Sequence, residues 1–441
     1  MKKFLIVVAV SLCLCSEAAV ACIGTPGTTY TPAQTFTMVQ GAINSLTAGQ
    51  SVVLCTNTTW QLSSQYGPLR ANKYVDLTSI YTDGFPHDNS RALFQIVDSA
   101  MGNAFRSDES DTSSGVLKAA DDFQLRNVRF DGGLRQFGVC PNPGCWGENA
   151  LVQMGGATSG QIIDSVEVLN SRVPASVALV RFTTPAEFPY SNGCIHAQAT
   201  NNTIGSAGDS TIEYRSDGLR LQCAAVEAYF NDIYDVTDVG IAIFGSPGTS
   251  STDRSKVHDN TIRTTAPTWR KFDTIGGISM VDFWGGDPGN CATYDGNMQY
   301  LDVYNNTVSG VVNDSVFRGN GYIKEGMAMG RKFFCSEFDC GGDFYVYGAR
   351  VYGNTLTGTM GYGFVIDGVH TWYFDSTNTT TAAHIGTPAV ASGRCVFSTD
   401  QCSVFPVVTG YAVHAGPHAN FVSTPKSGYV SGCMHGLDIT R

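Results

Sequence analysis

The sequence predicts an all-β solenoid in which short strands stack coil upon coil, and three observations predict this fold class. The chain of 441 residues holds 49 glycines and only 15% charged residues, which is typical of a turn-rich β protein and not of a disordered one. The stretch 211–264 contains two copies of one sequence repeat. Each copy is a Gly-led alternation of apolar and polar residues followed by a short strand that an Asn interrupts. The 29-residue spacing from Asn231 to Asn260 suits one coil of a solenoid.

Asparagines recur at comparable intervals along the chain. They are Asn127, Asn170, Asn202, Asn231, Asn260, Asn306 and Asn354. Asn tolerates the left-handed backbone of a tight turn, and stacked Asn amides can bond to one another along a solenoid axis. A unit of this size cannot bury its apolar face alone, so it must stack on copies of itself.

This pattern resembles the right-handed parallel β-helix of the pectate-lyase-like superfamily. The resemblance rests on the repeated Gly-apolar-x-apolar strand, the Asn turn and the entry segment 39–54, and it covers nearly the whole mature chain. It implies a single domain over 22–441 in which a short amphipathic helix caps the first coil. It implies no particular chemistry, because one solenoid carries many functions.

The first 21 residues predict a secretory signal peptide and therefore a secreted protein. They combine a basic start, an apolar run too short to span a bilayer and the segment Ala19-Val-Ala21. A lipid anchor on Cys22 is the less favoured alternative. No second hydrophobic span follows, so no transmembrane segment is expected in the mature chain.

The capping helix is expected over 35–47, with Phe36, Val39, Ile43 and Leu46 on one buried face. It would shield strand edges that could otherwise template aggregation. Early strands are expected at 51–54, 73–80 and 92–97, regular coils from 123 onward, and long loops at 265–297, 331–345 and 371–405. Segments 149–154 and 176–182 are similar enough to be stacked copies of one strand.

The cysteines predict disulfides. Of 14 cysteines two lie in the signal peptide, which leaves an even number in an exported chain. Three close pairs are expected to be bonded: Cys140–Cys145, Cys335–Cys340 and Cys395–Cys402. The pairing of Cys22, Cys55, Cys194, Cys223, Cys291 and Cys433 stays open, although Cys22 with Cys55 would tie the tail to the first coils. A zinc site is the weaker alternative, since no Cys pair has the C-x2-C spacing.

Five Asn-x-Ser/Thr sequons are candidate glycosylation sites if the source glycosylates, at Asn57, Asn201, Asn305, Asn313 and Asn378. The formal net charge of −11 leaves no basic stripe for phosphates, so a nucleic-acid partner is not expected. An acidic surface repels polyanions unless local Arg, Lys or bound Ca²⁺ reverses the field. A neutral glycan is therefore at least as suitable a ligand as pectin or alginate.

Aligning the strands on their Gly predicts columns of outward side chains, because stacked coils superpose equivalent positions. Two places after the Gly stand Arg220, Ala242, Ser279, Ala328 and Val365. Four places after it stand Gln222, Phe244, Val281, Gly330 and Asp367, with Gln153 and Arg181 expected before them. Two places before it stand Ser216, Asp238, Ile275 and Lys324.

In polygalacturonases and pectate lyases this strand face carries the chemistry. Segment 216–221 resembles the hydrolases' Asn-Thr-Asp-Gly strand, with Asp217 on its Asp. Val239 and Gly276 stand where those enzymes have a second Asp and a His, which argues against polygalacturonase activity because hydrolysis needs two carboxylates.

The leading hypothesis is an exported enzyme that cleaves or epimerises a polysaccharide. Arg220 or Lys324 would be the base, Asp217 and Asp238 the carboxylates, and His370 a further acid/base candidate. Asp217, Asp235 and Asp238 could hold Ca²⁺. The candidate substrate-binding residues are Arg181, Gln222, Trp269, Trp284 and Asp367. The plainer alternative for such residues is that Asp before Gly serves a turn and that Arg–Asp pairs form solvated ladders.

The competing hypothesis is a non-catalytic wall, filament or glycan-binding adhesion protein. This hypothesis rests on the outward residues Ala242, Ser279, Ala328 and Val365, whose side chains are small and apolar enough to pack against another subunit.

Overall fold

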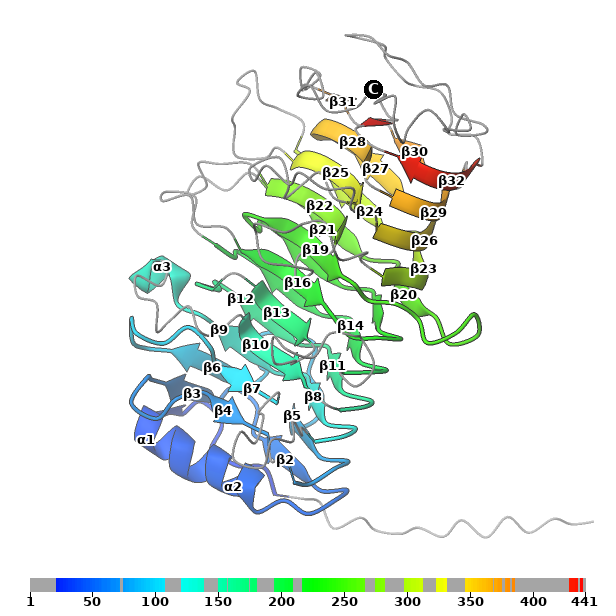
Figure 1. Cartoon of the computed structure of the whole chain (residues 1–441). Coiled ribbons are helices and arrows are strands. Elements are labelled where there is room, and N and C mark those ends of the chain that lie inside the picture. Colours follow the sequence, from blue (N-terminus) through cyan, green and yellow to red (C-terminus); the bar gives the residue numbers. More distant parts are fainter. Residues whose placement is uncertain are drawn as a thin grey trace, which may run out of the picture.

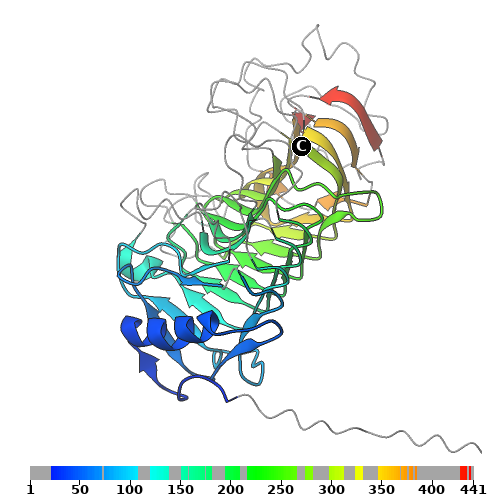
Figure 2. The ribbon, with the colours of Figure 1, turned by 60° about the horizontal axis from the view of Figure 1, so that its bottom comes forward.

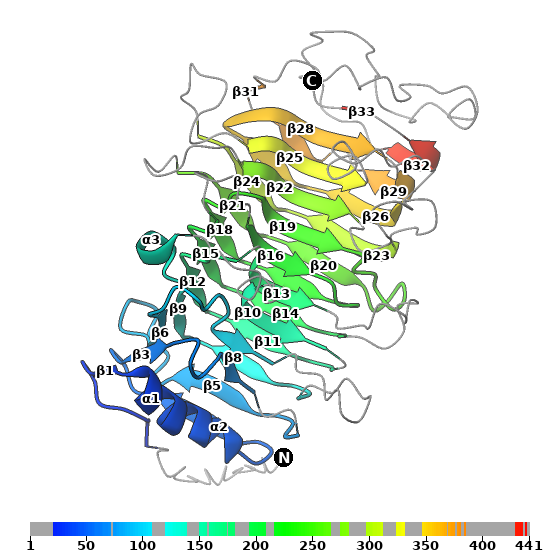
Figure 3. The ribbon, with the colours of Figure 1, turned by 60° about the vertical axis from the view of Figure 1, so that its left-hand side comes forward.

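The computed structural model is a parallel β-helix, as the sequence predicted (Figure 1). It describes residues 21–71, 74–107, 120–138, 150–156, 158–173, 175–180, 194–208, 216–265, 274–281, 297–311, 323–330, 346–367, 369–374, 377–380, 383–384, 428–434 and 437–438. The described strands form three sheets, and the chain visits them in the order sheet A, sheet B, sheet C once in each coil. Figure 3 shows the strands of successive coils lying one above another.

Sheet A contains β2 (Ser51–Leu54), β5 (Ser79–Thr82), β8 (Gln124–Arg126), β11 (Ile162–Asp164), β14 (Gln198–Thr200), β17 (Glu227–Tyr229), β20 (Ser255–His258), β23 (Asn297–Tyr304), β26 (Val346–Tyr352), β29 (Val369–Phe374) and β32 (Gly428–Met434). Sheet B contains β1 (Thr29–Tyr30), β3 (Thr59–Leu62), β6 (Leu93–Ile96), β9 (Arg129–Asp131), β12 (Glu167–Leu169), β15 (Thr203–Gly205), β18 (Asp232–Tyr234), β21 (Thr261–Arg263), β24 (Thr307–Ser309), β27 (Thr355–Thr357) and β30 (Thr379–Thr380). Sheet C contains β4 (Leu69–Arg70), β7 (Phe105–Arg106), β10 (Ala150–Gly155), β13 (Ala175–Val180), β16 (Asp217–Leu221), β19 (Val239–Phe244), β22 (Thr274–Val281), β25 (Ile323–Gly330), β28 (Thr359–Asp367), β31 (Ala383–His384) and β33 (Leu437–Asp438).

All neighbouring strands pair in parallel except at the C-terminal end, where β32 and β33 pair antiparallel with β29 and β28. The inward side chains of the three sheets meet in one continuous apolar core, represented in one coil by Leu219, Ala228 and Ile233. The strands β22, β30 and β31 lie within the stretches 265–297 and 371–405 that the sequence predicted as loops.

The N-terminal cap is a short helical segment that runs from Pro32 to Asn44 as α1 (Pro32–Thr35), the π-helical η1 (Phe36–Gln40) and α2 (Gly41–Asn44). It lies across the first coil (Figure 2). Gln40 pairs with the edge of sheet C, since its amide donates to the Arg70 carbonyl at 2.9 Å and accepts from the Arg70 N–H at 2.8 Å. The cap therefore satisfies backbone groups that an open edge would expose.

Three of the four residues predicted for the buried face of this helix are buried, but Phe36 is 40% exposed. Phe36 packs instead against the ring of Tyr66, with ring centroids 5.6 Å apart. A regular helix pattern misplaces Phe36 because the π-helical turn changes the residue spacing on the buried face.

A ladder of asparagine amides runs along the turn from sheet A to sheet B. Its members are Asn202, Asn231, Asn260, Asn306, Asn354 and Asn378, all buried. Each amide nitrogen donates to the amide oxygen of the next member at 2.8 to 2.9 Å, from Asn202 to Asn378. Five of the seven predicted asparagines therefore stack, and Asn378 extends the ladder by one coil.

Asn127 and Asn170 do not belong to this ladder. Asn127 occupies the left-handed position one residue earlier in the same turn, with φ 50°, and Asn170 lies after β12 in the turn toward sheet C. Left-handed backbone is also found at the residue before each of five ladder members: Asn201, Phe230, Asp259, Asn305 and Gly353. The two properties of Asn that the sequence analysis combined thus belong to neighbouring positions of the turn.

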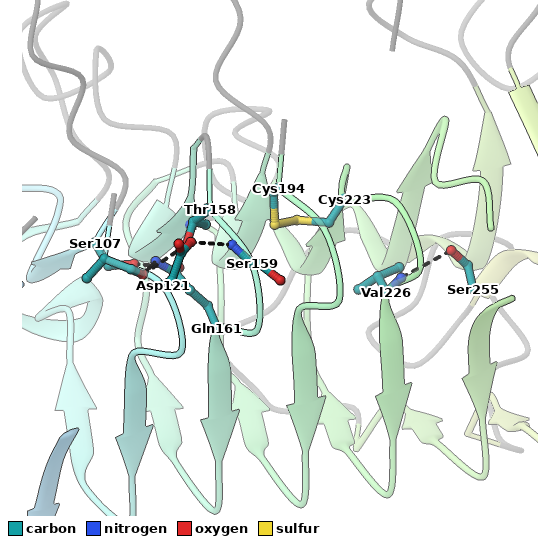
Figure 4. The surroundings of a disulfide bond; sticks show 11 residues. Ser107, Asp121, Thr158, Ser159, Gln161, Cys194, Cys223, Val226 and Ser255 are labelled. Carbon is teal, nitrogen blue, oxygen red and sulfur yellow. Dashed lines mark hydrogen bonds between the residues drawn. A yellow bond between two sulfur atoms is a disulfide. The ribbon is translucent and has the colours of Figure 1, made fainter. Parts of the chain in front are cut away.

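Two disulfides lie among the described residues, Cys22–Cys55 and Cys194–Cys223. The first settles a pairing that the sequence left open, and it ties the tail to the first coils. Cys194–Cys223 joins neighbouring coils at the corner between sheets C and A, where Asp121 accepts hydrogen bonds from the Thr158 hydroxyl and the Ser159 N–H (Figure 4). The expected pairs Cys140–Cys145, Cys335–Cys340 and Cys395–Cys402 lie outside the described residues.

No helix in the described part of the chain is long and apolar enough to cross a membrane.

Candidate functional site

The outer face of sheet C is the part of the β-helix that long connections flank. Between sheets A and B only two residues separate the strands from β8–β9 to β26–β27. The connections that enter or leave sheet C in the later coils span 264–273, 282–296, 310–322 and 331–345. Loops on a rigid scaffold are where binding and catalytic residues concentrate, so this face is the first candidate for a site.

A local departure from strict alternation at the Gly decides which residues of the Gly-led strands point outward. A Cβ on Gly218 would lie 2.5 Å from the Ile233 side chain, and one on Gly240 would lie 2.5 Å from Ile262, so both glycines face the core. The residue after each Gly, such as Leu219, also belongs to the core. Because the Gly and the residue after it both face the core, the residue before the Gly and the residue two places after it point outward.

This departure brings Asp217 and Arg220 together on the outer face. Ser216 is fully buried and its hydroxyl donates to the Val173 carbonyl, so this member of the column predicted two places before the Gly does not lie on the outer face. The sequence analysis assumed strict alternation through the Gly, which the close approach of sheet B prevents.

Asp217 and Arg220 form a buried ion pair. The Arg220 Nη2 lies 3.1 Å and its Nε 3.3 Å from Asp217 Oδ2, and the Val239 N–H donates to Asp217 Oδ1 at 3.3 Å. The Arg220 side chain is only 11% exposed and the Asp217 side chain only 3%. The Arg220 guanidinium also lies 5.2 Å from the centroid of the Phe244 ring.

Burial raises the pKa of Asp217 above its ordinary value, although the positive charge and hydrogen bonds of Arg220 and the N–H of Val239 oppose this shift. The direction follows from desolvation, which disfavours the charged carboxylate. A carboxyl group with a raised pKa beside a fixed cation is a candidate proton donor.

The register of sheet C confirms the column predicted two places after the Gly. Successive strands pair Arg220 with Ala242, Ala242 with Ser279, Ser279 with Ala328 and Ala328 with Val365. On the other side Arg220 pairs with Ala178, and Ala178 with Gln153. Gln153 therefore belongs to this column and not to the column of Gln222, where the sequence analysis placed it.

The outward side chains of this column are buried. Gln153 is 1%, Ala178 0%, Ala242 0%, Ser279 0% and Ala328 3% exposed. The Gln153 Oε1 and the Ser279 Oγ are buried and have no hydrogen-bond partner. Such atoms are rare in native proteins and call for an explanation.

The three aspartates proposed as a Ca²⁺ site do not form one. In the described part of the chain no group of three or more His, Cys, Asp or Glu side chains could hold a metal ion. Asp217 is bound to Arg220, whereas Asp235 lies in the turn after β18 and accepts hydrogen bonds from the N–H and hydroxyl of Thr265. The carboxylates of Asp217 and Asp235 thus bind different protein partners.

Asp238 directly precedes β19, and its N–H donates to the Ser216 carbonyl at 3.0 Å. It therefore lies in the coil next to Asp217. Lys324 is on β25, three strands from β16, and three strand spacings amount to about 14 Å. The backbone therefore does not bring Lys324 next to Asp217.

The remaining predicted site residues are dispersed or undescribed. Gln222 follows β16 and is half-buried, and Asp367 ends β28 opposite Gly330. His370 lies on β29 of sheet A and not on sheet C. Arg181, Trp269, Trp284 and the sequon at Asn313 lie outside the described residues.

Four sequons lie within the described part of the chain. Asn57, Asn201 and Asn305 are exposed, so each remains a candidate for glycosylation. Asn378 is fully buried and belongs to the amide ladder, where its oxygen accepts from Asn354 and its nitrogen donates to the Val351 carbonyl at 2.8 Å. Its amide is therefore engaged in the folded chain and is not available to carry a glycan.

Sheet A carries a stack of rings that the sequence analysis missed. Tyr229, His258, Tyr304 and Tyr352 occupy equivalent positions of successive strands, with ring centroids 5.1, 4.6 and 4.9 Å apart. Burial and neighbouring carboxylates raise the pKa of Tyr304 to about 12. Each ring precedes a ladder asparagine by two residues, so alignment on Asn would have revealed the column.

Comparisons with known proteins find only remote similarity to solved structures. Neither a protein-family model nor a curated protein matches the sequence. The A-module of mannuronan C-5 epimerase AlgE6 from Azotobacter vinelandii is 13% identical, with a TM-score of 0.40 over 79% of this chain and 84% of that chain. A PL6 alginate lyase in complex with a trisaccharide is 11% identical, with a TM-score of 0.40 over 80% and 77%. A tailspike protein of the E. coli bacteriophage HK620, in complex with a pentasaccharide, is 10% identical, with a TM-score of 0.40 over 78% and 62%.

Proposed function

We propose that this protein is exported, binds a polysaccharide across the outer face of sheet C and cleaves it with the Asp217–Arg220 pair. The observation that carries the proposal is this buried ion pair, in which the pKa of Asp217 is raised. A carboxyl group with a raised pKa can protonate the oxygen of a leaving sugar.

The three side chains take different roles in this proposal. Asp217 donates the proton, and Arg220 orients it and stabilises negative charge, because a guanidinium keeps its own proton in proteins. Asp238, in the neighbouring coil, supplies the second carboxylate that glycosidic hydrolysis requires. Lys324 stays a candidate base only for a substrate long enough to reach β25.

The test is an activity screen over neutral and anionic polysaccharides with wild-type protein and the variants Asp217→Asn, Asp238→Asn and Arg220→Ala. We expect each variant to lower turnover by roughly a hundredfold or more. The matched control is the ion pair of Arg263 with Asp232 on sheet B, with a separation of 2.8 Å and side chains 37% and 41% exposed. Arg263→Ala should leave turnover unchanged, and full activity in Asp217→Asn would refute the assignment.

A second candidate function is non-catalytic, as a component that assembles through this face. The observation that favours it is the row of small side chains at equivalent positions of sheet C, since Ala242, Ser279 and Ala328 follow one another on successive strands and carry no charge. Light scattering after size-exclusion chromatography tests it. A strict monomer at all concentrations would refute assembly, whereas a stable oligomer lost in Ala242→Arg would support it.

A further inference from the structure

The outer face of sheet A is flat over four neighbouring strands. On β17, β20, β23 and β26 it carries the stacked rings of Tyr229, His258, Tyr304 and Tyr352, and the planes of neighbouring rings differ by only 1°, 4° and 1°. The coils that carry these rings therefore superpose with little twist, and β20, β23 and β26 lie one above another in Figure 3. A flat sheet can lie against a second flat surface along its length. We define these four strands and the residue that follows each of them as the sheet A patch.

A column of charges that alternate in sign runs beside the rings. Its members on successive strands of the patch are Glu227, Lys256, Asp302 and Arg350. Lys256 Nζ lies 3.2 Å from Glu227 Oε1, and Arg350 Nε lies 3.5 Å from Asp302 Oδ1. Asp302 is also bound by Arg254 at 2.6 Å. The two end members stay accessible, since the Arg350 side chain is 51% exposed and that of Glu227 is 29% exposed.

The two halves of the patch carry opposite net charge. The half formed by β17 and β20 brings two anions, Glu227 and Asp259, and one cation, Lys256. In the half formed by β23 and β26 the single anion Asp302 is bound by two arginines. The patch is therefore formally neutral, on a chain whose formal net charge is −11. The net charge of the chain repels a second copy, whereas the patch does not.

The residues that follow the four strands end with a bulky side chain on one side and with none on the other. In chain order they are Phe230, Asp259, Asn305 and Gly353. Phe230 is 57% exposed although its backbone is left-handed, with φ 55°. This conformation is unfavourable for a bulky residue. Its ring leans against Tyr229 at the margin of sheet A, with ring centroids 5.3 Å apart. An exposed aromatic residue in a strained backbone points to a contact outside the chain.

The order of these side chains is complementary to its own reverse. In a two-fold contact that sets two patches face to face with antiparallel β-helix axes, β17 of each copy lies opposite β26 of the other. Glu227 then lies opposite Arg350, and Phe230 lies opposite Gly353, which has no side chain. The acidic half of each copy faces the basic half of the other. Parallel axes would instead bring Glu227 level with Glu227 and Arg350 level with Arg350.

We propose that this protein forms a two-fold dimer with a second copy of itself through the sheet A patch, with the axes of the two β-helices antiparallel. The inference does not rest on the function proposed above, because that function uses sheet C. The outer strands of the patch are three strand spacings apart, about 14 Å, so the contact is small. We expect a weak, reversible dimer with a dissociation constant on the order of 10 μM.

Sedimentation velocity of the full chain over a range from roughly 1 to 100 μM tests the proposal. The protein is produced in a host that does not glycosylate, because Asn305 belongs both to the patch and to a sequon. We expect the dimer fraction to rise with protein concentration. It should fall at high salt, since the contact between Glu227 and Arg350 is exposed.

Charge reversal tests the antiparallel pairing. Arg350→Glu and Glu227→Arg each place like charges at both Glu227–Arg350 contacts of the dimer, so each variant alone should be a monomer over the same range. An equimolar mixture of the two variants has opposite charges at both contacts and should form a heterodimer. Circular dichroism spectra equal to that of the wild type show that each variant is folded.

Phe230→Asn tests the contact at the turn. Asn adopts the left-handed backbone more readily than Phe, so the fold is kept while the ring is lost, and the dimer should weaken by roughly tenfold. The matched control is Phe85→Asn. Phe85 is likewise exposed, by 44%, and left-handed, with φ 45°, but it follows β5 outside the patch. Neither Phe85→Asn nor Ala242→Arg on sheet C should change the dimer.

Three outcomes would overturn the inference. One is a monomer at every concentration. Another is a dimer that persists in Arg350→Glu and in Phe230→Asn, or one that is lost in Ala242→Arg, because either result places the contact on another face. The third is a mixture of the two charge-reversal variants that stays monomeric although both variants are folded.

Discussion

Replacement of Asn260 by Ala tests the amide ladder at its centre. The Asn260 side chain donates to the Ala228 carbonyl and to the Asn306 amide oxygen, both at 2.9 Å. It accepts from the backbone N–H of Asn231 at 3.1 Å and from the Asn231 amide nitrogen at 2.8 Å. All of these groups are buried, so no solvent replaces the lost partner.

The expected cost follows from the groups that Asn260→Ala leaves unpaired. They include two backbone groups, the N–H of Asn231 and the carbonyl of Ala228. A buried polar group without a partner costs about 1 to 3 kcal/mol, so the free energy of unfolding should fall by about 4 kcal/mol. Each coil of a solenoid contacts only its neighbours, so the loss also weakens the contact between the two halves of the stack.

Urea unfolding followed by far-ultraviolet circular dichroism measures this loss. The control is Asn305→Gly, because Asn305 is exposed in the adjacent left-handed position with φ 55° and Gly adopts this conformation freely. The control should change the free energy of unfolding by no more than about 1 kcal/mol. Equal losses in Asn260→Ala and Asn305→Gly would refute the role of the ladder.

Three further predictions concern sheet C and its corner with sheet A. Cys194→Ser with Cys223→Ser should lower the free energy of unfolding by about 3 to 4 kcal/mol, the loop-closure value for a sequence separation of 29, as measured by urea unfolding with and without reductant. Gly218→Ala should cost at least about 1 to 3 kcal/mol, because its Cβ would lie 2.5 Å from the Ile233 side chain; an unchanged melting temperature would contradict the inward orientation of Gly218. The pKa of Asp217 is raised in the folded state, so its contribution to stability is full below about 3.8, the ordinary value, and is lost as pH rises through the folded pKa. Asp217→Asn should therefore gain stability relative to the wild type as pH rises through that window, and a constant difference in unfolding titrations would contradict the raised pKa.

The fold could be predicted from the sequence because each coil repeats the same few constraints. Alternation of apolar and polar residues predicts strands, and the spacing of Asn231 and Asn260 predicts one coil. The sequence even indicated the outward column through Arg220, since a common Gly sets the register of successive strands. These signals are local, and each coil repeats them.

The rest depends on contacts between coils that no local pattern contains. Gly218 faces inward because Ile233 of another sheet occupies the space that a side chain would need, and this contact shifts Ser216 away from the outer face. The partner of Cys194 is the equivalent cysteine of the next coil, and only the coil boundary identifies it. The proposed Ca²⁺ ligands failed for the same reason, since Asp235 bonds to Thr265 of the next coil.

The two-residue turn that carries the asparagine ladder fixes the distance between successive coils at one corner, from Asn202 to Asn378. The opposite corners can then accept inserted segments of any length without changing the pitch of the stack, because the amide bonds hold consecutive coils at a constant distance. A lineage of such proteins can therefore exchange the segments beside sheet C while the scaffold stays the same. The same rule makes the coil an interchangeable unit, since excision of the residues between equivalent asparagines would shorten the molecule and leave its cross-section intact.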